Sequence, residues 1–176
     1  MLKGQLCTVR HLLTADLNTF LALVNDLPSR GDYFSTHFKS PETMRKEFVQ
    51  NGFVSEDSEL FVIEDHTHHI VGVITHFKSR TPVTREIGYR LFDRSLTGQG
   101  YVSEACGLLI DHLFNVYQYH RLELLSAPEN KASLRVAEKC GFTPEGTLRE
   151  SFFIGGRYCD VVVCSLLRHE WERRQR

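Results

Sequence analysis

The fold is decided by the stretch Arg94-Ser95-Leu96-Thr97-Gly98-Gln99-Gly100-Tyr101-Val102-Ser103-Glu104, where a strand-like run stops and a helical pattern starts. Gly98 and Gly100 let the backbone approach a ligand closely, because glycine has no Cβ. The turn leaves several N–H groups at the positive end of a helix dipole, where phosphate oxygens bind well. The sequence therefore predicts an anion-binding turn between a strand at Glu86–Phe92 and a helix.

The neighbours of the two glycines argue against the familiar nucleotide-binding turns. No lysine followed by serine or threonine comes after Gly100, as an ATP-type phosphate loop requires. A dinucleotide-binding turn needs a third glycine where Ser103 stands, and an acidic residue closing the next strand, Arg121–Leu125. Two glycines in isolation are also typical of a simple tight turn, so that interpretation stays open.

Length and composition favour one domain over residues 1–176. A chain of 176 residues with 41% hydrophobic content buries roughly 70% of the surface that its unfolded form exposes. The net charge of −1 predicts neither nucleic-acid nor membrane binding. Five scattered cysteines without a CxxC pair argue against disulfides and zinc. We expect a cytoplasmic protein, monomeric or homodimeric.

Two amphipathic helices are expected after a first strand at Gln5–Arg10. Thr14 is placed to cap the first helix, and Leu27–Gly31 breaks it before an aromatic loop. The second helix starts at Ser40-Pro41 and stops near Asn51-Gly52, because serine caps, proline fits the first turn and glycine ends helices.

The middle of the chain has the two-residue period of strands. Glu59–Glu64 and Ile70–Lys78 are β-branched and aromatic runs, which predict an antiparallel hairpin. Its turn carries His66, His68 and His69, which invite a metal interpretation. Since no carboxylate or cysteine accompanies them at matching spacing, solvated turn histidines are the favoured interpretation, and we expect no metal.

Helices and strands alternate in the second half. The helix behind Gly100 carries an apolar stripe for packing on a sheet, and Arg121–Leu125 is the next strand. Asn130 then caps a short helix over Lys131–Lys139, which Gly141 ends. The closing strands are predicted over Phe142–Leu148, Phe152–Ile154 and Arg157–Leu167, with a Gly-Gly turn between the last two. This order indicates an α/β (α+β) domain with a mixed, mostly antiparallel sheet.

The motifs in this order resemble the GCN5-related N-acetyltransferase (GNAT) family, in particular its RimJ/RimL-type ribosomal-protein N-terminal acetyltransferases. Each piece alone is weak, but the set is specific and spans the chain from about Glu59 to Trp171. The resemblance implies an enzyme that moves acetyl from acetyl-CoA to a primary amine, and a central sheet with helices on both faces. The matching pieces are Glu86-Ile87-Gly88-Tyr89, Thr97-Gly98-Gln99-Gly100-Tyr101, Asn130-Lys131-Ala132-Ser133, Glu138-Lys139-Cys140-Gly141-Phe142, Glu145-Gly146 and Gly156-Arg157-Tyr158-Cys159-Asp160.

The resemblance also implies a cofactor site. Backbone amides of Gly98-Gln99-Gly100-Tyr101-Val102 would hold the pyrophosphate of acetyl-CoA, and Asn130 would border the cofactor. The strand ending at Leu91-Phe92 would splay from its neighbour and pair with the pantetheine arm. An N–H near Phe92 would then polarise the thioester carbonyl, because acyl transfer needs a donor where negative charge develops. Ser95 stands where the family has glutamine or arginine, which affects one side-chain contact.

The resemblance gives Ser133 the role of hydrogen-bonding the leaving thiolate. Many relatives use a tyrosine for this step, at the position that holds Ala137 here, whereas RimL-type enzymes use the serine of the Asn-x-x-Ser motif. A hydroxyl beside the sulfur suffices chemically. The alternative is that Ser133 only caps the helix after Asn130.

The catalytic base is less well defined. RimL-type enzymes place a glutamate where Phe152 stands here. Glu86 is the candidate substitute, since strand alternation puts it with Gly88 and Arg90 on one face. A salt bridge that fixes the strand is an equally good interpretation. Glu150 is a weaker second choice, and Glu104 is expected to be structural through the helix dipole.

The acceptor stays open between a peptide N-terminus and a small amine such as a polyamine or an antibiotic. The segments expected to face it, Pro28–Lys39 and Leu148–Tyr158, are aromatic with mixed charge. A polyamine site should be rich in carboxylates. A non-catalytic acyl-CoA-binding module and a nucleotide-binding regulator are the alternatives from other classes. The carboxylates near the first segment are Asp26, Asp32, Glu42 and Glu47.

Overall fold

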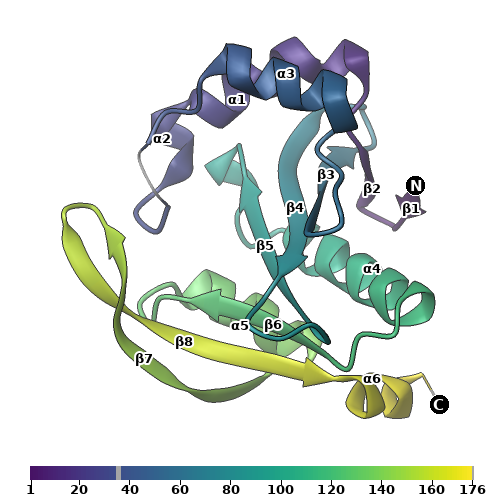
Figure 1. Ribbon diagram of the computed structural model, residues 1–176, viewed down its shortest axis with the longest axis vertical. Coiled ribbons are helices and arrows are strands. Elements are labelled where there is room, and N and C mark those ends of the chain that lie inside the picture. The colour runs from purple at the N-terminus through teal and green to yellow at the C-terminus, as the bar shows by residue number, and fades with distance from the viewer. Residues whose placement is uncertain (35–36, 176) are drawn as a thin grey trace.

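A single eight-stranded sheet runs through the computed structural model, which describes residues 1–34 and 37–175. The strand order is β1-β2-β3-β4-β5-β6-β8-β7, and only β5 and β6 run parallel (Figure 1). This confirms the predicted mixed, mostly antiparallel sheet. The strands are β1 (Leu2–Lys3), β2 (Cys7–His11), β3 (Ser58–Asp65), β4 (Ile70–Lys78), β5 (Thr84–Leu91), β6 (Arg121–Ser126), β7 (Thr143–Ile154) and β8 (Arg157–Leu167).

Helices cover both faces of the sheet, as the family resemblance implied. Strand β3 shows how alternation divides the core: Phe61 and Ile63 pack in the cluster around α4, whereas Val62 packs in the cluster around α1 and α3. Helix α5 lies on the same face as α4. The helices are α1 (Leu17–Asn25), α2 (Leu27–Arg30), α3 (Pro41–Asn51), α4 (Tyr101–Val116), α5 (Lys131–Cys140) and α6 (Arg168–Arg174), with short 3-10 turns at Thr14–Asp16 and Arg94–Leu96.

Several local predictions are confirmed by the hydrogen bonds at helix ends. The Ser40 hydroxyl accepts from the Thr43 amide at 3.4 Å, and Gly52 ends α3 in the left-handed conformation. Asn130 Oδ1 accepts from the Ser133 amide at 3.2 Å at the start of α5. Ser40 and Asn130 therefore cap the starts of α3 and α5, and Gly52 ends α3, as the sequence predicts.

Two predictions in the N-terminal part are wrong. Thr14 does not cap the first helix: a 3-10 turn precedes α1, and Asp16 Oδ2 accepts from the Leu13 amide at 2.8 Å while binding Arg10. The first helix does end at Asn25, as expected, but the segment after it was not expected to form α2, a separate helical turn. Pro28 is tolerated there because it stands in the first turn, where its missing N–H would have no partner.

The closing strands also differ from the prediction. The segments predicted as Phe142–Leu148 and Phe152–Ile154 form one long strand, β7, which begins at Thr143 and contains a bulge after Leu148. Leu148 pairs with Val161 and Phe152 with Cys159, so β7 has extra residues between these pairs. Glu150 adopts a φ of 49° in the bulge and donates its N–H to Asp160 Oδ1 at 2.9 Å. The β7–β8 hairpin extends away from the rest of the sheet (Figure 1).

Two of the turn histidines make local contacts, whereas His66 Nε2 contacts the distant Gln5 carbonyl oxygen. His68 contacts Glu64 at 2.8 Å, and His69 contacts Thr67 at 2.9 Å. Across residues 1–34 and 37–175, no group of three or more histidine, cysteine or carboxylate side chains is arranged to hold a metal ion. Within the same residues, no helix is long and apolar enough to span a membrane.

Glu104 anchors the N-terminal segment to α4. Its carboxylate accepts from the backbone amides of Gln5, Leu6 and Cys7, each at 2.8 Å. A Cβ at Gly4 would lie 2.3 Å from Glu104 Oε2, so only glycine leaves room for the carboxylate. Glu104 is therefore structural, as expected, although through these amides. Burial alone would raise the pKa of Glu104, but the amides outweigh it and hold the pKa below its ordinary value.

We predict that Glu104→Gln destabilises the protein at neutral pH by about 1.5–3 kcal/mol, because a charged acceptor of three amides is lost. The lowered pKa gives stability that is present above the pKa of the unfolded state and is lost as pH falls through the folded pKa. Urea unfolding of both proteins at neutral and acidic pH measures this. A difference that does not shrink on acidification would contradict the assignment.

Candidate active site

Strands β5 and β6 part shortly after they begin to pair. Their register is limited to Thr84↔Arg121, Arg85↔Leu122 and Glu86↔Glu123. Beyond these pairs β5 follows β4, and β6 follows β8, so the two strands diverge (Figure 1). The predicted splay of the strand ending at Leu91-Phe92 is present, and Glu86 is the last residue of β5 that pairs with β6.

The backbone of β5 presents polar groups to this opening. Phe92 donates its N–H to the Val71 carbonyl at 2.8 Å, which makes it a hydrogen-bonded residue of the β4–β5 ladder. Because such residues alternate in an antiparallel pair, Leu91 and Tyr89 direct their N–H and C=O groups away from β4 and toward the opening. The amide of Phe92 is thus unavailable to a ligand, and the expected donor near it becomes Leu91.

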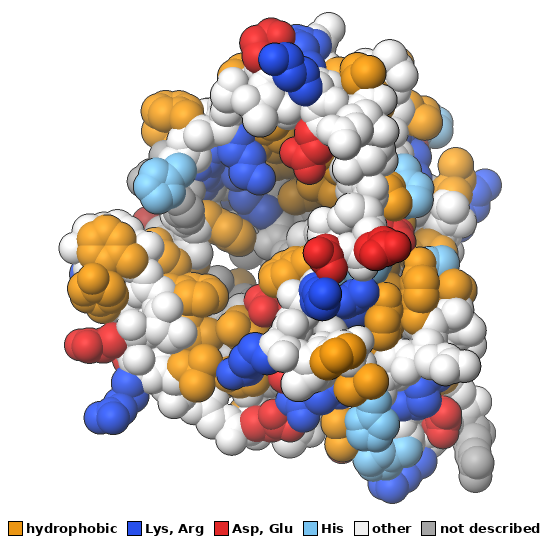
Figure 2. Space-filling view, viewed as in Figure 1, with side chains coloured by type: hydrophobic (Ala, Val, Ile, Leu, Met, Phe, Trp, Pro, Cys, Tyr) orange, Lys and Arg blue, Asp and Glu red, His pale blue; other side chains and the backbone are white. Residues whose placement is uncertain are grey.

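A cavity of about 970 Å³ lies at the opening. Figure 2 shows the molecule hollowed between the β7–β8 hairpin and α1–α3, with many hydrophobic side chains on the walls. Both segments expected to face the acceptor contribute, through Ser29–Phe34 and Ser151–Ile154. Residues 35 and 36 of the first segment lie outside the described residues.

The glycine turn forms one end of the cavity. Gly98 and Gly100 line it with φ angles of 84° and 98°, values that side chains with a Cβ rarely adopt. The amides of Tyr101 and Val102 belong to the first turn of α4 and have no intrahelical acceptor. Gln99 does not line the cavity: its amide donates to the Leu96 carbonyl at 3.2 Å. The free amides are those of an anion site.

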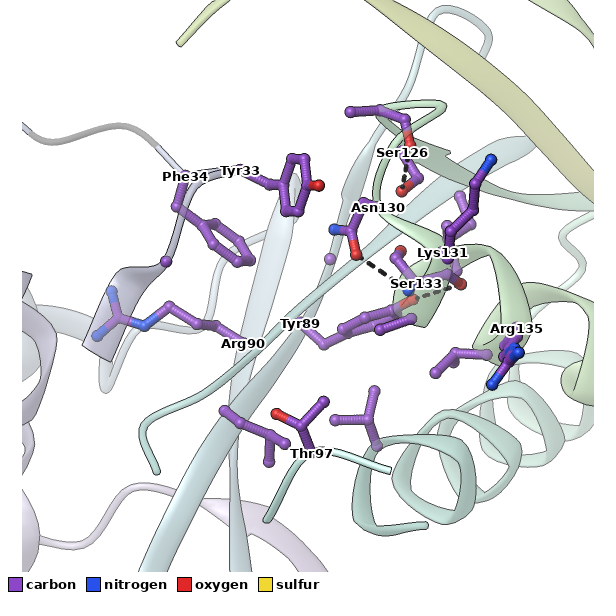
Figure 3. Close-up of a pocket in the computed structure, with 18 of the residues that line it drawn as sticks. Tyr33, Phe34, Tyr89, Arg90, Thr97, Ser126, Asn130, Lys131, Ser133 and Arg135 are labelled. Carbon is purple, nitrogen blue, oxygen red and sulfur yellow. Dashed lines mark hydrogen bonds between the residues drawn. The ribbon is translucent and has the colours of Figure 1, made fainter. Parts of the chain in front are cut away.

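Ser133 lines the opposite wall, in the first turn of α5. Asn130, which also lines the cavity, holds the Ser133 amide. The Ser133 hydroxyl is not occupied by helix capping: its oxygen lies 2.8 Å from the hydroxyl of Tyr89 on β5 (Figure 3). Asn130, and not Ser133, is therefore the cap of α5, and the thiolate role of Ser133 stays a prediction.

Glu86 lies on the other face of β5 from Tyr89. Alternation puts it with Arg90, whose guanidinium donates to the Leu23 carbonyl of α1 at 2.7 Å. Burial and, to a smaller extent, the nearby Glu123 carboxylate raise the pKa of Glu86 to about 7, against the opposing effect of Arg80. No salt bridge joins Glu86 to another described residue, which disfavours a purely structural role. A carboxylate with this pKa can exchange a proton near neutral pH.

Glu150 does not share the cavity. It is exposed in the β7 bulge and borders a separate shallow hollow with Arg149 and Asp160. Of the two carboxylates considered as a base, only Glu86 lies in the same cavity as Ser133 and the glycine turn.

Comparison with known proteins decides the family. Residues 7–143 match the acetyltransferase (GNAT) domain model. The chain belongs to the GNAT acetyltransferase family. A probable N-acetyltransferase, YjcK, of Bacillus subtilis is 29% identical over 98% of the chain and 100% of its own length. A spermidine N(1)-acetyltransferase of Vibrio cholerae is 27% identical over 95% of the chain and 96% of its own length.

The fold of this GNAT acetyltransferase is shared with solved structures. RimL, a ribosomal α-N-protein acetyltransferase in complex with coenzyme A, superposes with a TM-score of 0.81 at 22% identity. The superposition covers 93% of this chain and 95% of RimL. The expected GNAT-type fold is therefore confirmed, and the chain is an N-acetyltransferase.

Sequence reasoning missed several residues of the GNAT site. Lys131, Arg135 and Lys139 line the cavity at four-residue intervals on α5, a basic stripe that helical spacing alone would have revealed. The sequence predicts no role for Tyr89 beyond its place in the Glu86-Ile87-Gly88-Tyr89 motif. Its contact with Ser133 joins residues 44 positions apart, so no local pattern predicts it.

We predict that Glu86→Gln changes the pH dependence of stability. A carboxyl whose folded pKa of about 7 exceeds its unfolded value near 4.5 makes the folded state lose stability as pH rises through that range. The glutamine variant escapes this loss, so its melting temperature relative to the parent should be higher at pH 8 than at pH 5. If the melting temperatures of the variant and the parent differ by the same amount at pH 5 and at pH 8, Glu86 has an ordinary pKa.

Proposed function

We propose that this chain transfers an acetyl group from acetyl-CoA to the α-amine of a peptide N-terminus. Transfer is direct, in a ternary complex, without a covalent enzyme intermediate. One observation carries the proposal: β5 and β6 diverge around a cavity that has the glycine turn at one end and both Glu86 and Ser133 on its walls. Metal is not required by this chemistry.

The cofactor would bind along the opening. Its pyrophosphate accepts hydrogen bonds from the free amides of the turn at Gly98–Val102, at the positive end of the α4 dipole. Arg135 and Lys139 face the same cavity and supply positive charge for phosphate oxygens. The pantetheine arm pairs with the outward backbone groups of Tyr89 and Leu91, in the manner of an added strand. Asn130 borders it.

The groups that act on the amine and on the sulfur lie on opposite faces of β5. Glu86 accepts a proton from the acceptor ammonium, and the neutral nitrogen attacks the thioester carbonyl carbon. The N–H of Leu91 donates to the oxygen on which negative charge develops. As the C–N bond forms, the C–S bond breaks and its electron pair leaves on sulfur, while the nitrogen loses its remaining excess proton to water. The Ser133 hydroxyl donates a hydrogen bond to that thiolate.

The charge of the acceptor side favours a peptide over a polyamine. Among the carboxylates considered for polyamine binding, Asp32 lines the cavity, whereas Asp26, Glu42 and Glu47 do not. Arg30 and Arg90 line the same part, which disfavours a ligand with several ammonium groups. A single N-terminal amine on a mostly uncharged chain suits Tyr33 and Phe34 better (Figure 3). A polyamine remains the second candidate because of the spermidine N(1)-acetyltransferase relative.

We predict that Gly100→Val abolishes measurable binding of CoA in calorimetry. A Cβ at this position lies 3.0 Å from Leu6 Cδ1, and a β-branched residue at a φ of 98° is strained, so the turn must move. Gly107→Ala is the matched control on α4. Nothing lies within 4 Å of its added Cβ, and it should keep the parental affinity. If a folded Gly100→Val protein binds CoA with the parental affinity, the cofactor does not bind at this turn.

The acceptor is tested with matched amines. Acetyl-CoA is supplied with a peptide that has a free N-terminus, the same peptide N-terminally blocked but carrying a lysine, and spermidine, while thiol release and product mass are followed. The proposal predicts the highest kcat/KM for the free N-terminus. A higher value for spermidine would assign the second candidate, and binding without thiol release for every amine would indicate a non-catalytic module.

A further inference from the structure

Tyr89 and Ser133 form a hydroxyl pair across the cavity wall. The Tyr89 hydroxyl lies 2.8 Å from Ser133 Oγ and 3.3 Å from the Ser133 carbonyl oxygen. Figure 3 shows the tyrosine reaching from β5 toward the first turn of α5, with both contacts drawn. Both residues line the cavity. The strand that would hold the pantetheine arm therefore also contacts the residue that would meet its sulfur.

A serine hydroxyl needs help to serve a leaving thiolate. Serine is a much weaker acid than a thiol, so Ser133 stabilises the sulfur by donating a hydrogen bond and does not protonate it. Its hydrogen must then point to the sulfur. A serine inside a helix tends instead to donate to a carbonyl of the preceding turn, which would turn this hydrogen away.

The two hydroxyl hydrogens of the pair can be arranged in two ways. In one, Ser133 donates to the Tyr89 oxygen, and Tyr89 donates to the Ser133 carbonyl. In the other, Tyr89 donates to Ser133 Oγ, which leaves the Ser133 hydrogen for a third group. Rotation of two hydroxyl hydrogens converts one into the other without movement of heavy atoms.

We propose that Tyr89 is the positioning residue of Ser133. Before reaction, the Tyr89 oxygen accepts the hydrogen bond of the Ser133 hydroxyl. When the thiolate forms, Tyr89 donates to Ser133 Oγ, so that the serine hydrogen is directed to sulfur. This inference rests on the proposed function. Burial raises the pKa of Tyr89 far above its ordinary value, despite the opposing hydrogen bond from Ser133. The phenol therefore stays neutral and keeps the hydrogen that it donates.

The test compares Tyr89→Phe, Ser133→Ala and the double variant. Tyr89→Phe should lower kcat about tenfold, the effect of one lost hydrogen bond to a reacting group, while the Kd of CoA changes less than twofold. The double variant should be no slower than Ser133→Ala alone, because Tyr89 acts through Ser133. Tyr117→Phe is the control: it removes a phenol hydrogen bond to Glu59 at 3.0 Å, outside the cavity, and should leave kcat unchanged.

A second measurement does not depend on turnover. The thiol of bound CoA is titrated by its ultraviolet absorbance, and its pKa should be about one unit higher on Tyr89→Phe than on the parent. An unchanged thiol pKa, or multiplicative effects in the double variant, would overturn the pairing. If Ser133→Ala is slow and Tyr89→Phe is not, only this inference fails. If the parent transfers acetyl to no amine, the proposed function fails and the inference with it.

Discussion

The early end of pairing between β5 and β6 is the constraint on which the rest of the site depends. Buried backbone groups need hydrogen-bond partners, and the outward groups of Tyr89 and Leu91 lose theirs where the strands diverge. Each strand keeps its other neighbour, so the sheet stays continuous at β4 and β8. The result is an internal edge that is held open by the fold and suited to an extended, amide-containing ligand.

The position of this opening brings together elements that are distant in sequence. Alternation along β5 sends Glu86 and Arg90 to the α1 side and Tyr89 to the α5 side. The first turns of α4 and α5 both border the cavity, and the free amides at the start of α4 face it. The N-terminal segment supports the arrangement, since Leu6 touches the site of Gly100 while Glu104 holds the Leu6 amide. A carboxyl group of raised pKa, a helix N-terminus with free amides and a hydroxyl thereby border one cavity.

The sequence predicted what is local. Two glycines before an apolar helical stripe indicated the turn, and Asn130 indicated the start of α5, because caps and positive φ angles depend on residue type. What it missed is set by register and tertiary contact. The use of the Phe92 amide follows from pairing with β4, the Glu150 bulge from pairing with β8, and the Tyr89–Ser133 contact from packing of β5 on α5. For Glu86 the sequence offers two equal interpretations; its half-buried position next to Glu123 favours the base, which stays a prediction.

We infer that the opening between β5 and β6 holds the cofactor, and a crystal structure of the protein with CoA would show whether it does. The pyrophosphate should lie on the amides of the Gly98–Val102 turn. The pantetheine arm should lie against the backbone of Tyr89 and Leu91, with the sulfur beside Ser133. CoA bound anywhere else, with the opening empty or filled by side chains, would contradict it.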